Sequence, residues 1–303
     1  MRRTIELDNN YEFPDGWGVN NAAAPLRDVL LGDPAEFEWR PVSAIARRTL
    51  QNLKRLGTRF DRQLAMQQHR EMVDIYINNG VRCHFLDAYE GLPYSVFARD
   101  NNAMTPWGPL VTSCQALARR RDYAVVAEFY RRAGVPIWKW VTAGYFEGGD
   151  FDIIEPGAVI LGFGGERSDE AGATQVAHWV EAEGWEALVV PFPGDFVHMD
   201  ALVVMIAPKL AVVCSDALEP YVLDWLKGRG IEIVDVPYRS CVRLGCNVVA
   251  LGNERVLSMA TNNELNERLR ARGFEVFAPN MSMFQYGGGG VHCLSQELRR
   301  DPV

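Results

Sequence analysis

The chain has 303 residues, of which 48% are hydrophobic and 23% are charged, a composition typical of a globular protein. Its net charge is −8 and its lysines and arginines are scattered, whereas a nucleic-acid-binding protein needs a clustered basic face. No apolar run approaches the roughly 20 residues that cross a bilayer, and the opening segment MRRTIELDNN lacks the apolar stretch of a secretory signal. We therefore expect a soluble, cytoplasmic protein that binds neither nucleic acid nor membrane.

Taken in chain order, one unit recurs five times: an amphipathic helix, a glycine and a short apolar strand. The copies span residues 73–87, 127–140, 177–192, 221–237 and 264–279. The glycines at positions 80, 134, 184, 230 and 273 are expected to adopt the left-handed conformation that ends a helix. The β-branched run after each glycine suits a buried strand. The arginine run 119–121, which precedes the second copy, is interpreted as a solvated helix start.

Between these units the sequence predicts hairpins, at residues 100–114, 150–164, 201–215 and 247–260, because a turn signal interrupts each apolar run. A fifth hairpin is split between residues 26–33 and the segment around 291–295. Repeats of about 40–50 residues suggest a closed or stacked array. We therefore predict an α/β protein whose five ββαβ units form a pseudo-symmetric five-bladed propeller, one catalytic domain over residues 1–303. The alternative is an open three-layer α/β domain; a dinucleotide fold is disfavoured because no strand leads into a G-x-G-x-x-G helix.

Six cysteines are present, and in a cytosolic chain of this size we expect free thiols. They are Cys83, Cys114, Cys214, Cys241, Cys246 and Cys293. Cys241 and Cys246 enclose four residues, but no second Cys/His pair has zinc-finger spacing, so a structural metal site is not expected. Five of the six are expected to lie in the core, since cysteine is among the most buried residue types.

Four short segments carry polar residues that a hydrophobic core does not need. They are Arg99-Asp100, Glu147-Gly-Gly-Asp150, His198-Met-Asp200, and Cys293, which follows the glycines 287–290. Each lies at the start of a predicted hairpin or at the closing edge of the ring, and equivalent positions of a pseudo-symmetric ring converge on its axis. We therefore predict one central pocket that holds carboxylates, an imidazole and a thiol. Each residue alone also fits a plainer interpretation, as a core residue or a simple turn, so the constellation carries the prediction.

In this order and near these spacings, RD, EGGD, HMD and GGGGVHC resemble the guanidino-group-modifying superfamily. Its members include arginine deiminases, agmatine deiminases, dimethylargininases and amidinotransferases. The resemblance covers the chain from about residue 19 to the C-terminus and agrees with the fivefold repeat. It implies the five-bladed α/β propeller called the pentein fold, and we expect neither a cofactor nor a metal.

The resemblance also implies roles for the polar residues. Cys293 would attack the guanidino carbon, and His198 would protonate the departing amine and later activate water. Glu147 belongs to this catalytic set. With Asp100 and Asp200 it would hold the guanidinium by charge-assisted hydrogen bonds, and Asp150, which completes the motif, is also expected to bind the substrate.

A further segment, residues 162–172, resembles the deiminase segment whose arginine binds the carboxylate of the substrate. This resemblance implies that Arg167 binds a carboxylate. The plainer interpretation is a helix start, with Ser168 as a good N-cap and Arg167 paired on the surface with Asp169 or Glu170.

Together these features predict a hydrolase that releases ammonia or an alkylamine from arginine or an arginine derivative through a covalent thiouronium. The alternative is an amidinotransferase, in which an amine instead of water takes the amidino group. A third hypothesis, a non-catalytic protein of this fold such as a translation anti-association factor, is disfavoured by the joint presence of Cys293, His198 and Glu147. The sequence leaves open which guanidino compound is the substrate and whether the chain forms a homo-oligomer.

Overall fold

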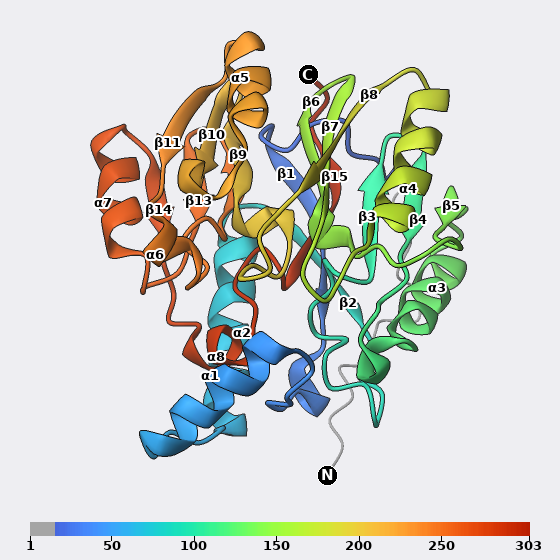
Figure 1. Cartoon of the computed structure of the whole chain (residues 1–303). Coiled ribbons are helices and arrows are strands. Elements are labelled where there is room, and N and C mark those ends of the chain that lie inside the picture. The colour runs from blue at the N-terminus through green and yellow to red at the C-terminus, as the bar shows by residue number, and fades with distance from the viewer. Residues whose placement is uncertain (1–15) are drawn as a thin grey trace.

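The computed structural model describes residues 16–303, which form five three-stranded sheets with helices along their outer side (Figure 1). In each sheet the middle strand pairs antiparallel with one neighbour and parallel with the other. The antiparallel pairs are hairpins in four sheets, and the parallel strand follows a helix. The predicted ββαβ repeat is therefore confirmed.

The fifth sheet joins the two ends of the chain, as expected for the split hairpin. Its strands are β15 (Ser295–Arg300), β1 (Leu26–Gly32) and β2 (Arg82–Leu86), in that order. The other sheets, in strand order, are β3 (Asn102–Thr105), β4 (Gly108–Val111) and β5 (Lys139–Trp140); β6 (Phe151–Glu155), β7 (Ala158–Phe163) and β8 (Glu186–Pro191); β9 (Val203–Ala207), β10 (Leu210–Val213) and β11 (Glu232–Asp235); and β12 (Val249–Gly252), β13 (Arg255–Leu257) and β14 (Glu275–Phe277).

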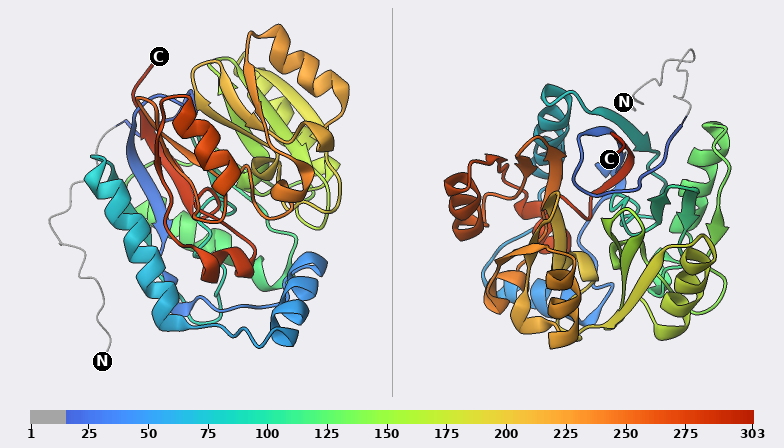
Figure 2. Two further views of the ribbon diagram at one scale, coloured as in Figure 1. Left: turned by 90° about the vertical axis from the view of Figure 1, so that its left-hand side faces the viewer. Right: turned by 90° about the horizontal axis from the view of Figure 1, so that it is seen from above.

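One helix of each repeat connects the middle strand to the parallel strand. These helices are α2 (Arg62–Asn78), α3 (Asp122–Arg132), α4 (Glu170–Ala182), α5 (Pro220–Gly228) and α7 (Asn263–Ala271). The remaining helices are α1 (Ala44–Arg55), α6 (Tyr238–Cys241) and α8 (Ser282–Gly287). In the second view of Figure 2 the five connecting helices lie around the outside and the strands inside.

The glycines predicted to end the connecting helices all have positive φ, between 67° and 90°. No atom lies within 4 Å of the position that a Cβ would take at any of them. The left-handed backbone, rather than lack of space, therefore requires glycine at positions 80, 134, 184, 230 and 273.

Five edge strands, one from each sheet, each follow a polar or glycine-rich segment; we call β3, β6, β9, β12 and β15 the inner strands. Strands of different sheets contact each other here: β15 lies against β3, β6 against β9, and β9 against β12. Nearly all residues of the inner strands are buried, and this includes most of the polar residues of β3 (NAMT) and β15 (SQELRR). The inner strands therefore bring the segments that precede them to one end of the molecule.

Among residues 16–303, every helix is too short or too polar to traverse a lipid bilayer. The segment MRRTIELDNN, used above for the expectation about secretion, lies outside the described residues.

Candidate active site

The polar segments meet where the inner strands begin. Cys293, Asp100 and Asn247 lie two residues ahead of β15, β3 and β12. The other two inner strands follow 3-10 turns that contact each other, η3 (Gly148–Asp150) before β6 and η4 (Met199–Ala201) before β9. The predicted set covers four of these five positions and omits Asn247. Its offset from the strand, the same as that of Asp100 and Cys293, is the signal that identifies it.

His198 lies between two carboxylates. Its Nε2 is 2.9 Å from Glu147 Oε2, and its Nδ1 is 3.7 Å from Asp100 Oδ1. Burial alone lowers the pKa of His198, but Asp100, Asp150 and Glu147 outweigh burial and raise this pKa to about 9. The ring is therefore protonated at neutral pH and can donate a proton before it accepts one.

Glu147 is fully buried and contacts two cations besides His198. Arg167 Nη1 donates to Glu147 Oε2 at 3.1 Å, and Arg119 Nη1 lies 3.9 Å from the same oxygen. Burial raises the pKa of Glu147, but Arg167, His198 and Arg119 together hold it below its usual range. Glu147 is therefore ionised in the interior.

Close packing requires the two glycines of the EGGD segment. A Cβ at Gly149 would lie 2.7 Å from the His198 ring, and a Cβ at Gly148 would overlap the backbone oxygens of Arg99 and Asn102. A larger residue at either position would displace Glu147 from His198, so the Gly-Gly pair sets the geometry of the site.

Asp150 connects the two turns. It accepts hydrogen bonds from Ser168 Oγ and, at 2.8 Å, from Met199 N, and burial is the main cause that raises its pKa to about 7. Protein donors thus occupy both oxygens, and a role in substrate binding stays a prediction.

The expectation that Ser168 caps the following helix is wrong. Asp169 caps α4 through Gly172 N, because Ser168 Oγ is engaged by Asp150 and by the Glu147 backbone N–H.

Cys293 is buried beside an amide and a carboxylate. Asn247 Nδ2 donates to its Sγ at 3.1 Å, and Asp200 Oδ2 lies 3.7 Å from this sulfur. The same Asp200 oxygen is 2.8 Å from His292 Nδ1. Burial, with added repulsion from Asp200 and Asp100, raises the pKa of Cys293 well above its ordinary value. The thiol is therefore the favoured form until positive charge comes close to the sulfur.

Two buried arginines, Arg119 and Arg167, flank the cluster formed by Asp100, Glu147, His198, Asp200 and Cys293. Arg119 forms ion pairs with Asp100 and Asp122, so the interpretation of the run 119–121 as solvated is wrong for Arg119. These carboxylates compensate the desolvation of its guanidinium, whereas Arg120 is exposed and lies over the Tyr145 ring. The carboxylate that Arg167 meets is Glu147, so the plainer expectation of a surface pair with the residues at the start of α4 is also wrong.

Three buried atoms of the cluster have no hydrogen-bond partner within residues 16–303: Asp100 Oδ1, Glu147 Oε1 and His198 Nδ1. Buried polar groups are rarely left unsatisfied. Each of these three residues offers one ligand atom, and these atoms all lie within 4.8 Å of one another. Two carboxylates and an imidazole at this separation can bind a small cation, either a metal ion or a planar organic cation with several N–H groups.

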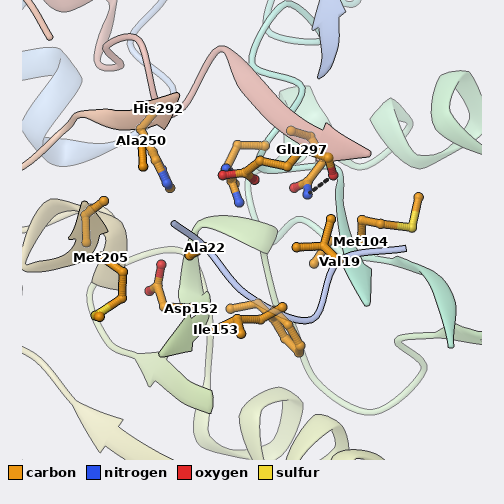
Figure 3. Close-up of a pocket in the computed structure, with 14 residues that line it drawn as sticks. Val19, Ala22, Met104, Asp152, Ile153, Met205, Ala250, His292 and Glu297 are labelled. Carbon is orange, nitrogen blue, oxygen red and sulfur yellow. Dashed lines mark hydrogen bonds and ion pairs between the residues drawn. The ribbon is translucent and has the colours of Figure 1, made fainter. Parts of the chain in front are cut away.

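A second polar region lies further along the inner strands (Figure 3). This pocket is lined by residues of all five inner strands, among them Met104, Asp152, Met205, Ala250 and Glu297. In Figure 3 the His292 ring points into the pocket. Because His292 also contacts Asp200, it lies between the pocket and the cluster around Cys293.

Comparison with known proteins gives a consistent family. Residues 33–300 match the model of the family described as N,N dimethylarginine dimethylhydrolase, eukaryotic. The uncharacterized protein YkgA of Bacillus subtilis is 27% identical over 238 residues, 78% of this chain and 80% of that protein. An arginine deiminase of Rhodococcus erythropolis is 27% identical over 251 residues, 70% of this chain but 61% of the deiminase, so the chain spans only part of that enzyme.

Solved structures share the fold. Dimethylarginine dimethylaminohydrolase from Pseudomonas aeruginosa, in complex with citrulline, has a TM-score of 0.74 at 19% identity and covers 90% of this chain and 99% of its own. The N-terminal domain of the cyanobacterial arginine dihydrolase ArgZ, bound to substrate, has a TM-score of 0.78 at 17% identity, covering 90% and 98%.

Proposed function

Because the chain belongs to the N,N dimethylarginine dimethylhydrolase family, we propose that it is a cysteine-dependent hydrolase of arginine or an arginine derivative. It acts on a non-peptide carbon–nitrogen bond of the guanidino group, and its products are a ureido compound and ammonia or an alkylamine. One observation carries the proposal: near a buried thiol, Asp100, Glu147 and His198 each have a buried polar atom without a partner in the described chain, and one ligand atom of each lies within 4.8 Å of the others.

A guanidinium fits this arrangement by charge and by hydrogen bonding. Its N–H groups can donate to Asp100 Oδ1 and Glu147 Oε1, the two carboxylate atoms of this group without a partner in the described chain. Asp200, 3.7 Å from Cys293 Sγ, holds the same cation near the sulfur. Paired hydrogen bonds from carboxylates orient the planar group and place its carbon for attack.

Substrate binding also activates the nucleophile. Asp200 and Asp100 disfavour the Cys293 thiolate, and a guanidinium between them and the sulfur cancels this repulsion. The thiolate therefore forms when the cation is bound, and the thiol proton leaves to solvent. Thiolate character, which controls cysteine reactivity, thus depends on the substrate.

In the first half-reaction, Cys293 Sγ bonds to the guanidino carbon. The carbon–nitrogen bond of the leaving amine then breaks as the protonated His198 gives that nitrogen a proton. Glu147 keeps His198 protonated and oriented through its 2.9 Å contact with Nε2, so Nδ1 is the atom that faces the substrate. The product of this step is a covalent thiouronium on Cys293.

In the second half-reaction, His198, now neutral, takes a proton from water as the oxygen bonds to the same carbon. The carbon–sulfur bond breaks, and the ureido product departs with regeneration of Cys293. Asp150 positions both turns through its hydrogen bonds with Ser168 Oγ and Met199 N.

Arg167 binds the far end of the substrate when it carries a carboxylate. Its buried guanidinium donates to Glu147 through Nη1, whereas the nitrogens of the Arg119 guanidinium are already hydrogen-bonded to Asp100, Asp122, Tyr94 and Asn101. Arg167 Nε, which lacks a partner in the described chain, remains available as a donor.

We also infer that the five sheets close into one propeller that acts as a single catalytic unit. The lining of one pocket by all five inner strands supports a closed ring, as does the pairing of β15 with β1 across the chain ends.

A substrate panel tests the function. Arginine, methylated arginines, agmatine and guanidino acids are incubated with the protein, and ammonia, alkylamine and ureido products are measured with and without a primary amine. We expect ureido product without added amine. Turnover only in the presence of an amine, with transfer of the amidino group, would instead identify an amidinotransferase, and no turnover of any compound would contradict the proposal.

A further inference from the structure

Asn247 occupies the fifth equivalent position at the starts of the inner strands. Asp100 and Cys293 stand two residues ahead of their strands, and so does Asn247 ahead of β12. Glu147 and His198 stand in the turns that precede β6 and β9. Four of the five repeats thus supply a residue to the proposed chemistry, and Asn247 is the polar residue that the remaining repeat places beside them.

Both ends of the Asn247 amide are used, and both contact the nucleophile segment. Nδ2 donates to Cys293 Sγ at 3.1 Å, and Oδ1 accepts from His292 N at 2.9 Å. The amide is fully buried, and Gly290 lets it come close, because a Cβ there would collide with Asn247 Oδ1. The orientation of the amide is therefore set by one donor and one acceptor contact, each to a different residue of the same turn.

The charges around the sulfur make this contact important. Asp200 and Asp100 face Cys293 and disfavour the thiolate. His292 is bonded to Asp200, and His198 lies near Asp100. Among the described side chains, Asn247 provides the hydrogen bond that lowers the pKa of the Cys293 thiol, and the backbone at Gly290 acts in the same direction. An N–H donor stabilises the charged form of an acceptor more than the neutral form.

We infer that Asn247 is a positioning residue for Cys293. Its Nδ2–H stabilises the Cys293 thiolate by a hydrogen bond, and its Oδ1 fixes the turn that carries the sulfur by accepting from His292 N. The assignment of Cys293 as nucleophile rests on the proposed function, whereas the hydrogen bond and its effect on the sulfur do not.

Two substitutions separate the two ends of the amide. Asn247→Asp retains an oxygen for His292 N but replaces the donor with a negative charge beside the sulfur. Asn247→Ala removes both contacts. The matched control is Asn262→Ala, since Asn262 is also a buried amide and donates to the carbonyls of Leu244 and Gly245 in the same loop without contacting Cys293.

The readout is the pH dependence of Cys293 alkylation by iodoacetamide, followed by mass spectrometry of the Cys293 peptide, in the substrate-free protein. At a pH below the apparent pKa of the thiol, Asn247→Ala should slow alkylation about tenfold or more, because a hydrogen bond to a charged group shifts an equilibrium by at least that factor. Asn247→Asp should shift the profile further to alkaline pH, and Asn262→Ala should leave it in place while lowering the melting temperature.

Wild-type alkylation profiles in both Asn247 variants would overturn the inference. So would a shift of equal size in Asn262→Ala, because that result would show a general loosening of the loop. Since the assay contains no guanidino compound, the inference and the proposed function fail separately. A shifted profile in a protein that hydrolyses no guanidino substrate would leave Asn247 assigned and the function wrong.

Discussion

The inner strands carry two buried polar regions, one at their starts and one in the pocket of Figure 3, and these regions compensate charge differently. In the pocket, Glu297 pairs with Arg99 and with Arg300. Burial raises the pKa of Asp152, whose Oδ2 lacks a partner within residues 16–303, far above the usual value and so favours the neutral carboxyl. At the strand starts, Glu147 stays ionised while one of its oxygens lacks a partner within residues 16–303. The difference supports our proposal that the strand starts bind an external cation, whereas the ion pairs of the pocket stabilise the fold.

Removal of the nucleophile should give the largest effect. Cys293→Ser should lower turnover roughly a thousandfold or more, since loss of a covalent nucleophile removes the principal reaction path. Cys83→Ser, in the half-buried part of β2, is the control and should retain turnover. Product release by Cys293→Ser within about tenfold of wild type, with an unchanged melting temperature, would exclude Cys293 as nucleophile.

Neutralising one carboxylate in each region tests the comparison itself. Glu147→Gln and Asp100→Asn should lower kcat/KM about 30-fold to several thousand-fold, because a desolvated cation loses a partner. Glu297→Gln should instead lower the unfolding free energy by about 3–5 kcal/mol, since Arg99 and Arg300 lose their shared buried partner. Its kcat/KM should stay within about threefold of wild type when corrected for folded protein. A loss of kcat/KM in Glu297→Gln as large as that in Glu147→Gln or Asp100→Asn would contradict this difference between the two regions.

The pH dependence of turnover should report the ionisation of His198. Its pKa is raised to about 9 by nearby carboxylates, so the acid form that protonates the leaving amine is present below that pH and is lost above it. We expect kcat/KM to fall about tenfold per pH unit on the alkaline side. Glu147→Gln should move this limb to lower pH, because one of the carboxylates that stabilise the imidazolium is gone. An alkaline limb that does not move in this variant would assign the limb to another group.

The smallest effect concerns the far end of the substrate. Substrates with a carboxylate should have a higher kcat/KM than agmatine, which lacks one. Arg167→Ala should reduce this ratio of kcat/KM values by about tenfold, because it removes one charge-assisted hydrogen bond. Arg120→Ala, at an exposed neighbour of Arg119, should leave the ratio of kcat/KM values unchanged. Equal turnover of agmatine and arginine by the wild type would remove the carboxylate contact from the account.

The repeat and much of the site could be predicted because their signals are local. Each helix, glycine and strand is contiguous, and the segments that hold Asp100, Glu147, His198 and Cys293 stand at regular places in the repeat. The missed features depend on partners far apart in the chain. Arg119 is buried because it pairs with Asp100, and the role that we infer for Asn247 depends on the contact of its amide with Cys293. The contact of Arg119 leaves no mark in the adjacent sequence, whereas the position of Asn247 two residues ahead of β12, which matches that of Asp100 and Cys293, is a signal that could have identified it.

The central claim is that the guanidino carbon becomes bonded to Cys293. Rapid-quench mass spectrometry of His198→Gln with the best substrate of the panel tests it directly, because loss of the base should slow release of any adduct that forms. We predict an adduct on the Cys293 peptide whose added mass equals the substrate less its leaving amine. Turnover by the wild type with no such adduct on Cys293, in either protein at any quench time, would contradict the account.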